Sequence, residues 1–232
     1  MKKLYFIIVV IVLFSNCVNA QTNWLKSIGG SSQDEVNDIK IDNSGNIYSV
    51  GYFNSNANFG NSLQSLVALN GNDIFVQKTN PSGQVIWVKR FGGTANDRGL
   101  KVSLGISNEI YITGTYSGTI EFGNTTLTSV ENSIDVFLAK LDVNGEILWA
   151  NSIGGSYGDL VYGLAVDGAN SPVITGQYKG TAIFGSDTLT STLDTSGLAF
   201  SYDIFVVKYS SAGSISWLKN GGSPFDNRGS KI

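Results

Sequence analysis

A tryptophan-led unit recurs along this chain of 232 residues, at spacings of 63, 62 and 68 residues. A Gly-Gly pair follows five residues after each Trp, or four after the last, and an Asp stands four residues beyond the second Gly. A long fixed period indicates a repeat architecture, in which each unit buries its apolar faces only against its neighbours. The repeated residues are Trp24, Gly29-Gly30 and Asp34; Trp87, Gly92-Gly93 and Asp97; Trp149, Gly154-Gly155 and Asp159; Trp217, Gly221-Gly222 and Asp226.

Short alternating runs within each unit predict β-strands. In the second unit the runs cover residues 99–104, 109–114, 119–122, 135–141 and 146–150. They are rich in β-branched and aromatic residues, and polar turns with Gly separate them. Beyond the first 20 residues, no stretch of ten or more shows an apolar period of 3.6. The pattern therefore predicts an all-β protein.

We expect these strands to form β-propeller blades. The units span 24–86, 87–148, 149–216 and, in part, 217–232. They supply about three complete four-stranded blades and the start of a fourth, packed around an axis as an incomplete ring. The period exceeds the usual blade length of about 40 to 50 residues, so we expect an extra strand or a long loop near each Phe-Gly pair. A β-solenoid is the alternative.

The last unit stops within its first predicted strand, at residues 229–232. An open arc of blades would leave edge strands and apolar faces uncovered. We therefore expect further blades, either from a longer version of this chain or from another chain.

The N-terminus has the features of an export signal. Lys2-Lys3 precedes 11 apolar residues at 4–14, and Val18-Asn19-Ala20 offers a cleavage site. A helix of that length rises about 16 Å, too short for a hydrocarbon core of about 30 Å. We predict a signal peptide at 1–20, a repeat region at 21–232, no membrane span, and a secreted or cell-surface location. Lipidation of Cys17 is left open.

Composition excludes several kinds of chemistry. The chain has no His, and its one Cys lies in the predicted signal peptide, so Ser-His and Cys-His nucleophiles and zinc sites are excluded. Residues 21–232 carry 13 basic and 18 acidic side chains, a net charge of −5, which is unlike a nucleic-acid surface. We predict no catalytic residue, no cofactor-binding residue and no metal ligand.

Two sets of aspartates are candidate metal or catalytic sites. The Asp-x-x-Gly turns at 42–45 and 142–145 each offer one carboxylate, whereas calcium needs six to eight oxygens, so a hairpin turn is the favoured interpretation. The Asp residues after Gly-Gly, and those opening each D-[IV]-F strand, would suit acid-base pairs. They recur in every unit, which favours capping of backbone amides instead. The strand-opening residues are Asp73, Asp135 and Asp203.

The combined pattern resembles the SBBP-type β-propeller repeat of exported bacterial proteins, often from Bacteroidota. It reads W-x-K-x-x-G-G-x-x-x-D, N-x-[IV]-Y-x-x-G, F-G, D-[IV]-F-[VL]-x-K and a Gly turn before Trp. Pro172-Val173 and the short spacing after Trp217 depart from it. The resemblance implies a surface propeller with no assigned reaction. In the first unit the pattern comprises Trp24, Lys26, Gly29, Gly30, Asp34, Asn46, Tyr48, Gly51, Phe59, Gly60, Asp73, Phe75, Lys78, Gly83 and Trp87.

The functional expectation is a non-enzymatic binding or scaffold module for a protein or glycan. The third unit carries about six extra residues between Phe184 and Asp203, and we expect affinity to lie on the loop at 190–202. The alternative is a non-catalytic part of a larger polysaccharide-active enzyme. A likeness of 139–149 to the hairpin of quinoprotein propellers lacks the Cys pair and metal ligands of those enzymes.

Overall fold

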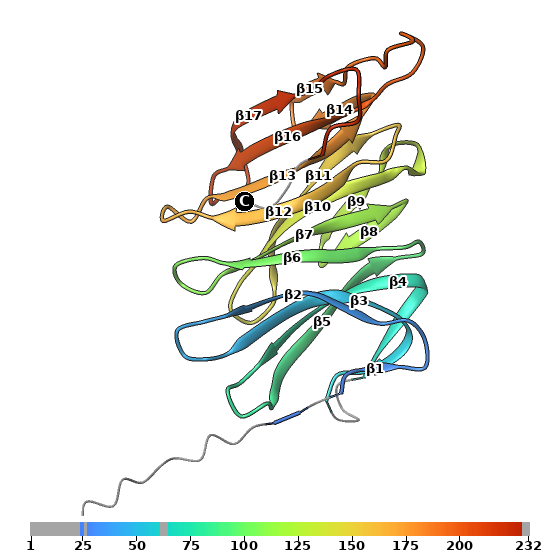
Figure 1. Ribbon diagram of the computed structural model, residues 1–232. Helices are drawn as coiled ribbons and strands as arrows, with labels where there is room; N and C mark the ends of the chain where they lie inside the picture. The colour runs from blue at the N-terminus through green and yellow to red at the C-terminus, as the bar shows by residue number, and fades with distance from the viewer. Residues whose placement is uncertain (1–23, 26, 61–64, 229–232) are drawn as a thin grey trace, which may run out of the picture.

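The computed structural model describes residues 24–25, 27–60 and 65–228. The predicted signal peptide and residues 229–232 lie outside this part of the chain. Three antiparallel sheets follow one another, with the first and third at opposite ends (Figure 1). The all-β prediction is confirmed, and the arrangement is propeller-like, although the described residues close no ring. Nowhere in this part of the chain is a helix long and apolar enough to span a membrane.

Each sheet has the same four antiparallel strands at its centre. The first holds β2 (Glu35–Ile41), β3 (Ile47–Asn58), β4 (Ser65–Thr79) and β5 (Val85–Gly93), together with the short β1 (Gly29–Gly30). The second holds β6 (Arg98–Leu104), β7 (Ile110–Ser117), β10 (Ile134–Leu141) and β11 (Ile147–Gly155). The third holds β12 (Leu160–Val166), β13 (Pro172–Lys179), β16 (Tyr202–Tyr209) and β17 (Ile215–Gly221).

A two-stranded hairpin accounts for the long period. Strands β8 (Thr119–Phe122) and β9 (Thr125–Thr128) belong to the second unit, yet β8 pairs with β5 of the first sheet. Likewise β14 (Thr181–Phe184) and β15 (Asp187–Thr190) belong to the third unit, and β14 pairs with β11 of the second sheet. The expected extra strand is therefore present near Phe122 and Phe184, and it extends the preceding sheet. Near Phe59 the corresponding hairpin is continuous with β3 and β4.

The phenylalanine of each hairpin joins two sheets. Phe122 is fully buried, and its ring centroid lies 5.3 Å from Phe91 of β5 and 5.0 Å from Phe137 of β10. Phe184 lies 5.2 Å from Phe205 of β16 in the same way. Each hairpin is thus hydrogen-bonded to one sheet while its aromatic ring packs against the next.

Two apolar clusters lie between consecutive sheets. One joins Tyr48, Val50, Ile74 and Val76 of the first sheet to Val102, Ile112 and Phe137 of the second. The other joins Tyr111, Val136 and Leu138 of the second sheet to Leu164, Ile174 and Phe205 of the third. Strands β2, β6 and β12 lie next to one another where the three sheets meet (Figure 1).

Each of the first three tryptophans docks on the turn that precedes the next tryptophan in the sequence. The indole nitrogens of Trp24, Trp87 and Trp149 donate to the carbonyls of Pro81, Val143 and Ser211, at 3.0, 3.2 and 3.1 Å. The turn glycine beneath each ring has a φ of 80° to 87° and would place a Cβ within about 3 Å of the indole. Trp87 of β5 and Trp149 of β11 therefore pack against the turn of the next sheet, as predicted for packing between neighbouring blades.

The fourth unit aligns one residue away from the sequence prediction. A Cβ on Gly92 or Gly154 would meet Asp73 or Asp135, and the residue that meets Asp203 in this way is Gly222. Gly222 is therefore the first glycine of its unit, and Ser223 takes the place of the second. The predicted pair Gly221-Gly222 is wrong as an equivalent of the other pairs.

The aspartate of the fourth unit moves with it. The backbone amides of Asp97 and Asp159 donate to the residue before the strand-opening Asp, and the corresponding amide of the fourth unit is that of Asn227, which donates to Tyr202. Asp226 instead matches Asn96, because both side chains accept from the same backbone position. The prediction that Asp226 is the repeated Asp is therefore wrong; strand pairing of Trp217 with Lys208, as Trp149 pairs with Lys140, fixes the offset.

Candidate functional site

Two buried carboxylates meet at the corner of the first sheet. The amide of Asp97 donates to the Asn72 carbonyl at 2.8 Å, which places Asp97 beside Asp73. Asp73 accepts from Leu69 N at 3.0 Å and from the Arg90 guanidinium at 2.5 Å. The other carboxylate accepts from the second glycine of the pair, Gly93, at 2.8 Å.

The second sheet repeats this corner without the arginine. Asp135 accepts from Val130 N at 3.1 Å and from Ser133 Oγ at 2.5 Å. Asp159 accepts from Gly155 N at 2.9 Å and from Lys179 N at 3.2 Å. The predicted role of these aspartates, capping backbone amides, is confirmed at both corners.

Burial makes the corner carboxyls weaker acids than an ordinary aspartate. It raises the pKa of Asp97 and Asp159 to about 7 and also raises the pKa of Asp73 and Asp135. A charged carboxylate is poorly solvated in the interior, and the neighbouring Asp adds like-charge repulsion. Such pairs resemble acid-base dyads, but these side chains have less than 2% exposure and bind the backbone. Their geometry serves the fold at every repeat.

The Asp-x-x-Gly turns are hairpin turns. Asp42 accepts from Ser44 N and Asn46 N at 2.9 Å each, and Asp142 does the same within its own turn. These hydrogen bonds outweigh partial burial and lower the pKa of Asp42. Gly45 and Gly145 complete the turns with φ values of 79° and 80°. Over the described ranges, no group of three or more acidic side chains is placed to hold a metal ion.

The insertion in the third unit is a projecting loop at residues 192–200. Ser191 and Ser201 flank it, and they match Ser129 and Ser133 of the second unit in their bonds to the backbone. The second unit has only the short 3-10 helix η2 (Val130–Asn132) between these anchors. Figure 1 shows the segment after β15 extending beyond the sheets. The extra residues therefore add surface without altering the frame.

The tip of the loop presents leucine to solvent. Asp194 accepts from Ser196 N at 3.0 Å and Ser196 Oγ at 2.5 Å, and its own amide donates to Ala199 O at 2.7 Å. This closed turn displays Leu198, which is 89% exposed. A turn that is already ordered loses less conformational freedom when a partner covers it.

Aromatic rings and one lysine form the base of the loop. Phe200 meets Tyr157 edge to face, with centroids 6.0 Å apart. The Lys179 ammonium lies 6.0 Å from the Tyr157 ring and 5.2 Å from the Tyr202 ring. Leu193 and Phe200 are joined by an antiparallel bridge. These contacts hold the loop against the rest of the third unit.

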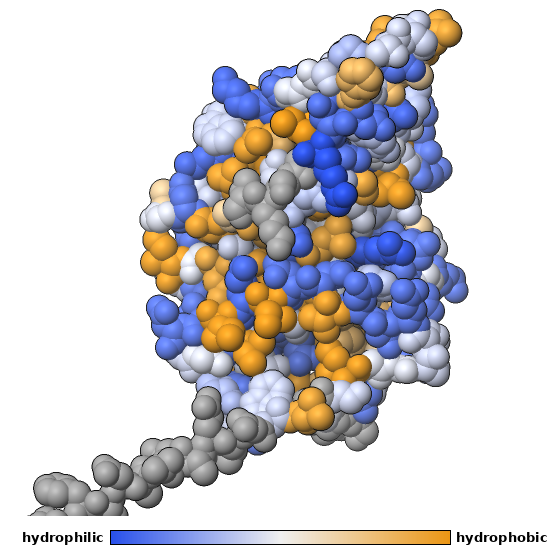
Figure 2. Space-filling model, in the orientation of Figure 1, coloured by the Kyte–Doolittle hydropathy of each residue, from blue (hydrophilic) through white to orange (hydrophobic). Residues whose placement is uncertain are grey.

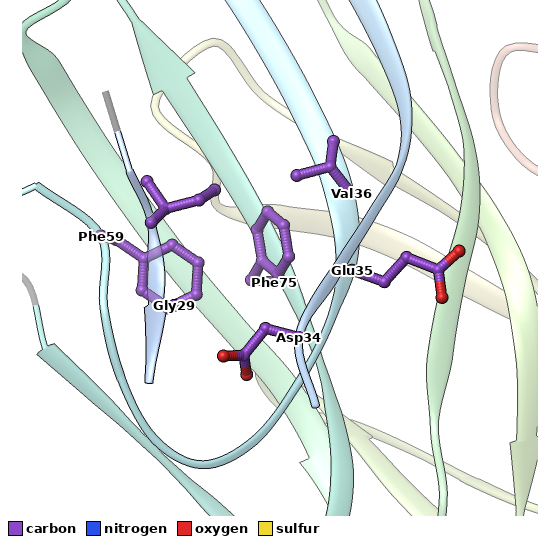
Figure 3. Close-up of a pocket in the computed structure, with 7 residues that line it drawn as sticks. Gly29, Asp34, Glu35, Val36, Phe59 and Phe75 are labelled. Carbon is purple, nitrogen blue, oxygen red and sulfur yellow. The ribbon is translucent and has the colours of Figure 1, made fainter. Parts of the chain in front are cut away.

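A small hollow at the first unit is too small to be a ligand site. Figure 3 shows the rings of Phe59 and Phe75 beside Gly29, with the Glu35 side chain directed away from them. The cavity has a volume of about 40 Å³. Ligand pockets usually enclose roughly 300 to 1,000 Å³. We interpret it as a packing gap of the first corner.

The inner strands β2, β6 and β12 carry residues of different types at equivalent positions of the three units. Lys40 of β2, Lys101 of β6 and Tyr162 of β12 line an open hollow of about 230 Å³. Asp38 lies at its edge and accepts from Val102 N at 3.1 Å. Sequence reasoning missed this cluster, although a comparison of the units position by position would have shown that these residues do not repeat.

One face of the first sheet leaves apolar residues uncovered. Val36, Ile39 and Ile41 of β2 are exposed, whereas Val102 and Leu164, at the places of Ile39 in β6 and β12, are buried between sheets. Figure 2 shows apolar side chains among polar ones over the front of β2 and β6. The first sheet therefore carries the same apolar pattern as an inter-sheet face.

Comparison with known proteins gives one distant relative that fits this architecture. No family model matches the chain. An uncharacterized WD repeat-containing protein, L264 of Acanthamoeba polyphaga mimivirus, is 26% identical over 159 residues, covering 57% of this chain. The chain matches only 11% of the length of that relative. The likeness is to a repeat-containing protein, and the finer resemblance to SBBP repeats remains a prediction.

Proposed function

We propose that the chain is a non-enzymatic, secreted or surface-displayed repeat module that binds a protein or a glycan through the loop at 192–200. The observation that carries the proposal is the loop itself. It is inserted between two anchors that the second unit also has, and it presents Leu198 on an ordered turn. A leucine that is exposed to solvent leaves apolar area in water, and a partner that covers it would gain the free energy of burying that area.

A protein partner is favoured over a glycan by the chemistry of the tip. Leucine offers apolar area but no flat ring for a sugar face and no hydrogen-bond donor for hydroxyl groups. The one aromatic residue of the loop, Phe200, is partly buried and packs on Tyr157 at the base of the loop. The likeness to a WD repeat-containing protein supports a repeat scaffold, and the binding experiments below identify the partner.

A loop graft tests the proposal. Replacing residues 192–200 by the three residues of η2, Val130–Asn132, keeps both serine anchors and removes only the insertion. Chemical cross-linking on intact producing cells and a glycan panel would identify what the unmodified chain binds. We expect the grafted chain to fold normally and to lose at least about 90% of that binding, as expected when an apolar hot spot is removed.

Retained binding in the grafted chain would contradict the proposal. Turnover of a polysaccharide by the chain would instead favour the alternative, a part of a polysaccharide-active enzyme. Secretion is tested separately by mass spectrometry of the exported protein, which we expect to begin at Gln21 after cleavage behind Ala20.

A further inference from the structure

The second glycine of each pair lies where a neighbouring hairpin crosses the edge of a sheet. A Cβ built on Gly93 would lie 1.8 Å from the carbonyl oxygen of Thr119, and one on Gly155 would lie 1.8 Å from that of Thr181. Gly30 meets the Asn56 carbonyl at the same distance. Such contacts leave no space for any side chain, which is why glycine stands at a close backbone approach.

All three of these edges are occupied within the chain. Strand β5 receives β8–β9, strand β11 receives β14–β15, and the short β1 lies against the hairpin portion of β3 and β4. The edge of β17 is the fourth of the series. Its second-glycine position is Ser223, identified by the Ser201 hydroxyl, which donates to the Ser223 carbonyl as Ser133 does to that of Gly155.

A second replacement accompanies the serine. At the occupied edges the second glycine donates its amide to the Asp four residues on: Asp34, Asp97 or Asp159. In the fourth unit that place belongs to Asn227, whose side-chain amide donates to Phe225 O at 2.6 Å and to Tyr202 O at 3.2 Å. The corner of β17 is therefore built from different contacts, with an asparagine amide in the place of the aspartate carboxylate.

We propose that the residue at the second-glycine position decides whether a sheet accepts the hairpin of the following repeat, and that Ser223 closes β17 to it. A one-residue slip that brought Gly221-Gly222 into place would turn the alternating faces of β17 over, moving Leu218 away from the apolar cluster it packs against. The edge of the third sheet thus differs from those of the first two in the strand it can accept. A serine side chain at this position needs the space that the hairpin carbonyl takes at the other edges.

Introducing the serine at an occupied edge tests this proposal. In Gly155→Ser we expect amides of the hairpin β14–β15 to exchange with deuterium on the order of a hundredfold faster, because the hairpin opens locally. Amides of β7 and β10 should exchange within about twofold of the unmodified chain. The matched control is Gly168→Ser, a turn glycine with no atom within 4 Å of its Cβ position, for which no change is expected.

Two further arms keep the test decisive. Gly93→Ser should release β8–β9 in the same way, and both variants are measured with and without sucrose, which favours the folded state. Unchanged protection of the hairpin in either serine variant would overturn the proposal. Equal loss in β7, β10 and the hairpin, with sucrose present, would overturn it too, because the serine would then unfold the whole sheet instead of releasing the hairpin alone.

Discussion

The sheet corners and the loop at 192–200 carry opposite kinds of residue. At the corners, glycines admit a crossing backbone and buried aspartates hold its amides. In the loop, a turn around Asp194 exposes Leu198 instead. The comparison teaches that the repeated residues fix a frame, and that the proposed binding surface lies where one unit departs from this frame.

The largest expected effect lies in the frame, at the phenylalanine that joins two sheets. Phe184→Ala removes a fully buried ring that packs on Phe205 and Tyr178, and it should lower the free energy of unfolding by about 3 to 5 kcal/mol. Urea denaturation measures the change. Phe225→Ala, at a ring that is 70% exposed, is the control and should stay within about 0.5 kcal/mol.

A cost below about 1 kcal/mol for Phe184→Ala would show that the hairpin is not part of the core. The hairpin phenylalanine would then not help to hold the sheets together.

The next effect is a loss of stability with rising pH that comes from the buried corner aspartates. Asp97 and Asp159 have a pKa of about 7 in the folded chain, against an ordinary value of 3.8. Below pH 4 both states are protonated and the full stability is present; as pH rises towards 7 the unfolded state loses protons first, so stability falls. The total loss should be on the order of a few kcal/mol.

Asp159→Asn should remove about half of that loss between pH 4 and 7, because the amide stays neutral. Asn227 shows that a corner of this fold accepts asparagine at the corresponding place. Thermal melting across pH measures the effect, and Asp187→Asn, at an exposed position of the β14–β15 hairpin, is the control. A pH profile identical to that of the unmodified chain would contradict the assignment of the loss to Asp159.

A smaller effect is expected where tryptophan docks on the following turn. Trp149→Phe keeps an aromatic ring but loses the hydrogen bond to the Ser211 carbonyl, at a cost of about 1 kcal/mol. Trp87→Phe should behave alike, since its indole donates to Val143 in the equivalent turn. Unequal costs in denaturation experiments would mean that the two junctions are not equivalent.

The smallest effect on stability is expected in the loop. Leu198→Ser should change the free energy of unfolding by less than about 0.5 kcal/mol, because the leucine is already in water. The same variant should weaken binding of the identified ligand at least about tenfold, as removal of a hot-spot contact does. Ala199→Ser, beside the tip, is the matched control for binding.

Much of the frame could be predicted from the sequence because its motifs are positional. The β8 bounds, Thr119–Phe122, agree with the predicted run, and the recurring aspartates cap amides as expected. The role of the glycine pair was not predictable in detail. Its two glycines serve two different neighbours, the Asp carboxylate and a hairpin carbonyl, and both come from distant parts of the chain.

The offset of the fourth unit was missed for a related physical reason. Counting from Gly221-Gly222 to Asp226 gives the same spacing as in the other units, so the sequence offers a false match. Strand pairing decides otherwise, because Trp217 must oppose Lys208 for Leu218 to face the core. For the loop, length was readable from the sequence, whereas the exposed Leu198 and the aromatic base depend on how the turn closes.

Amide hydrogen exchange over the whole unmodified chain tests the central claim most directly. If the corners are the rigid frame, the amides of Gly93 and Gly155, bonded to buried aspartates, should be protected nearly as well as those of β10. The amides of Ser196 and Leu198 should exchange orders of magnitude faster. Fast exchange at the two glycines, or protection of the loop equal to that of β10, would contradict the division between a common frame and an added binding loop.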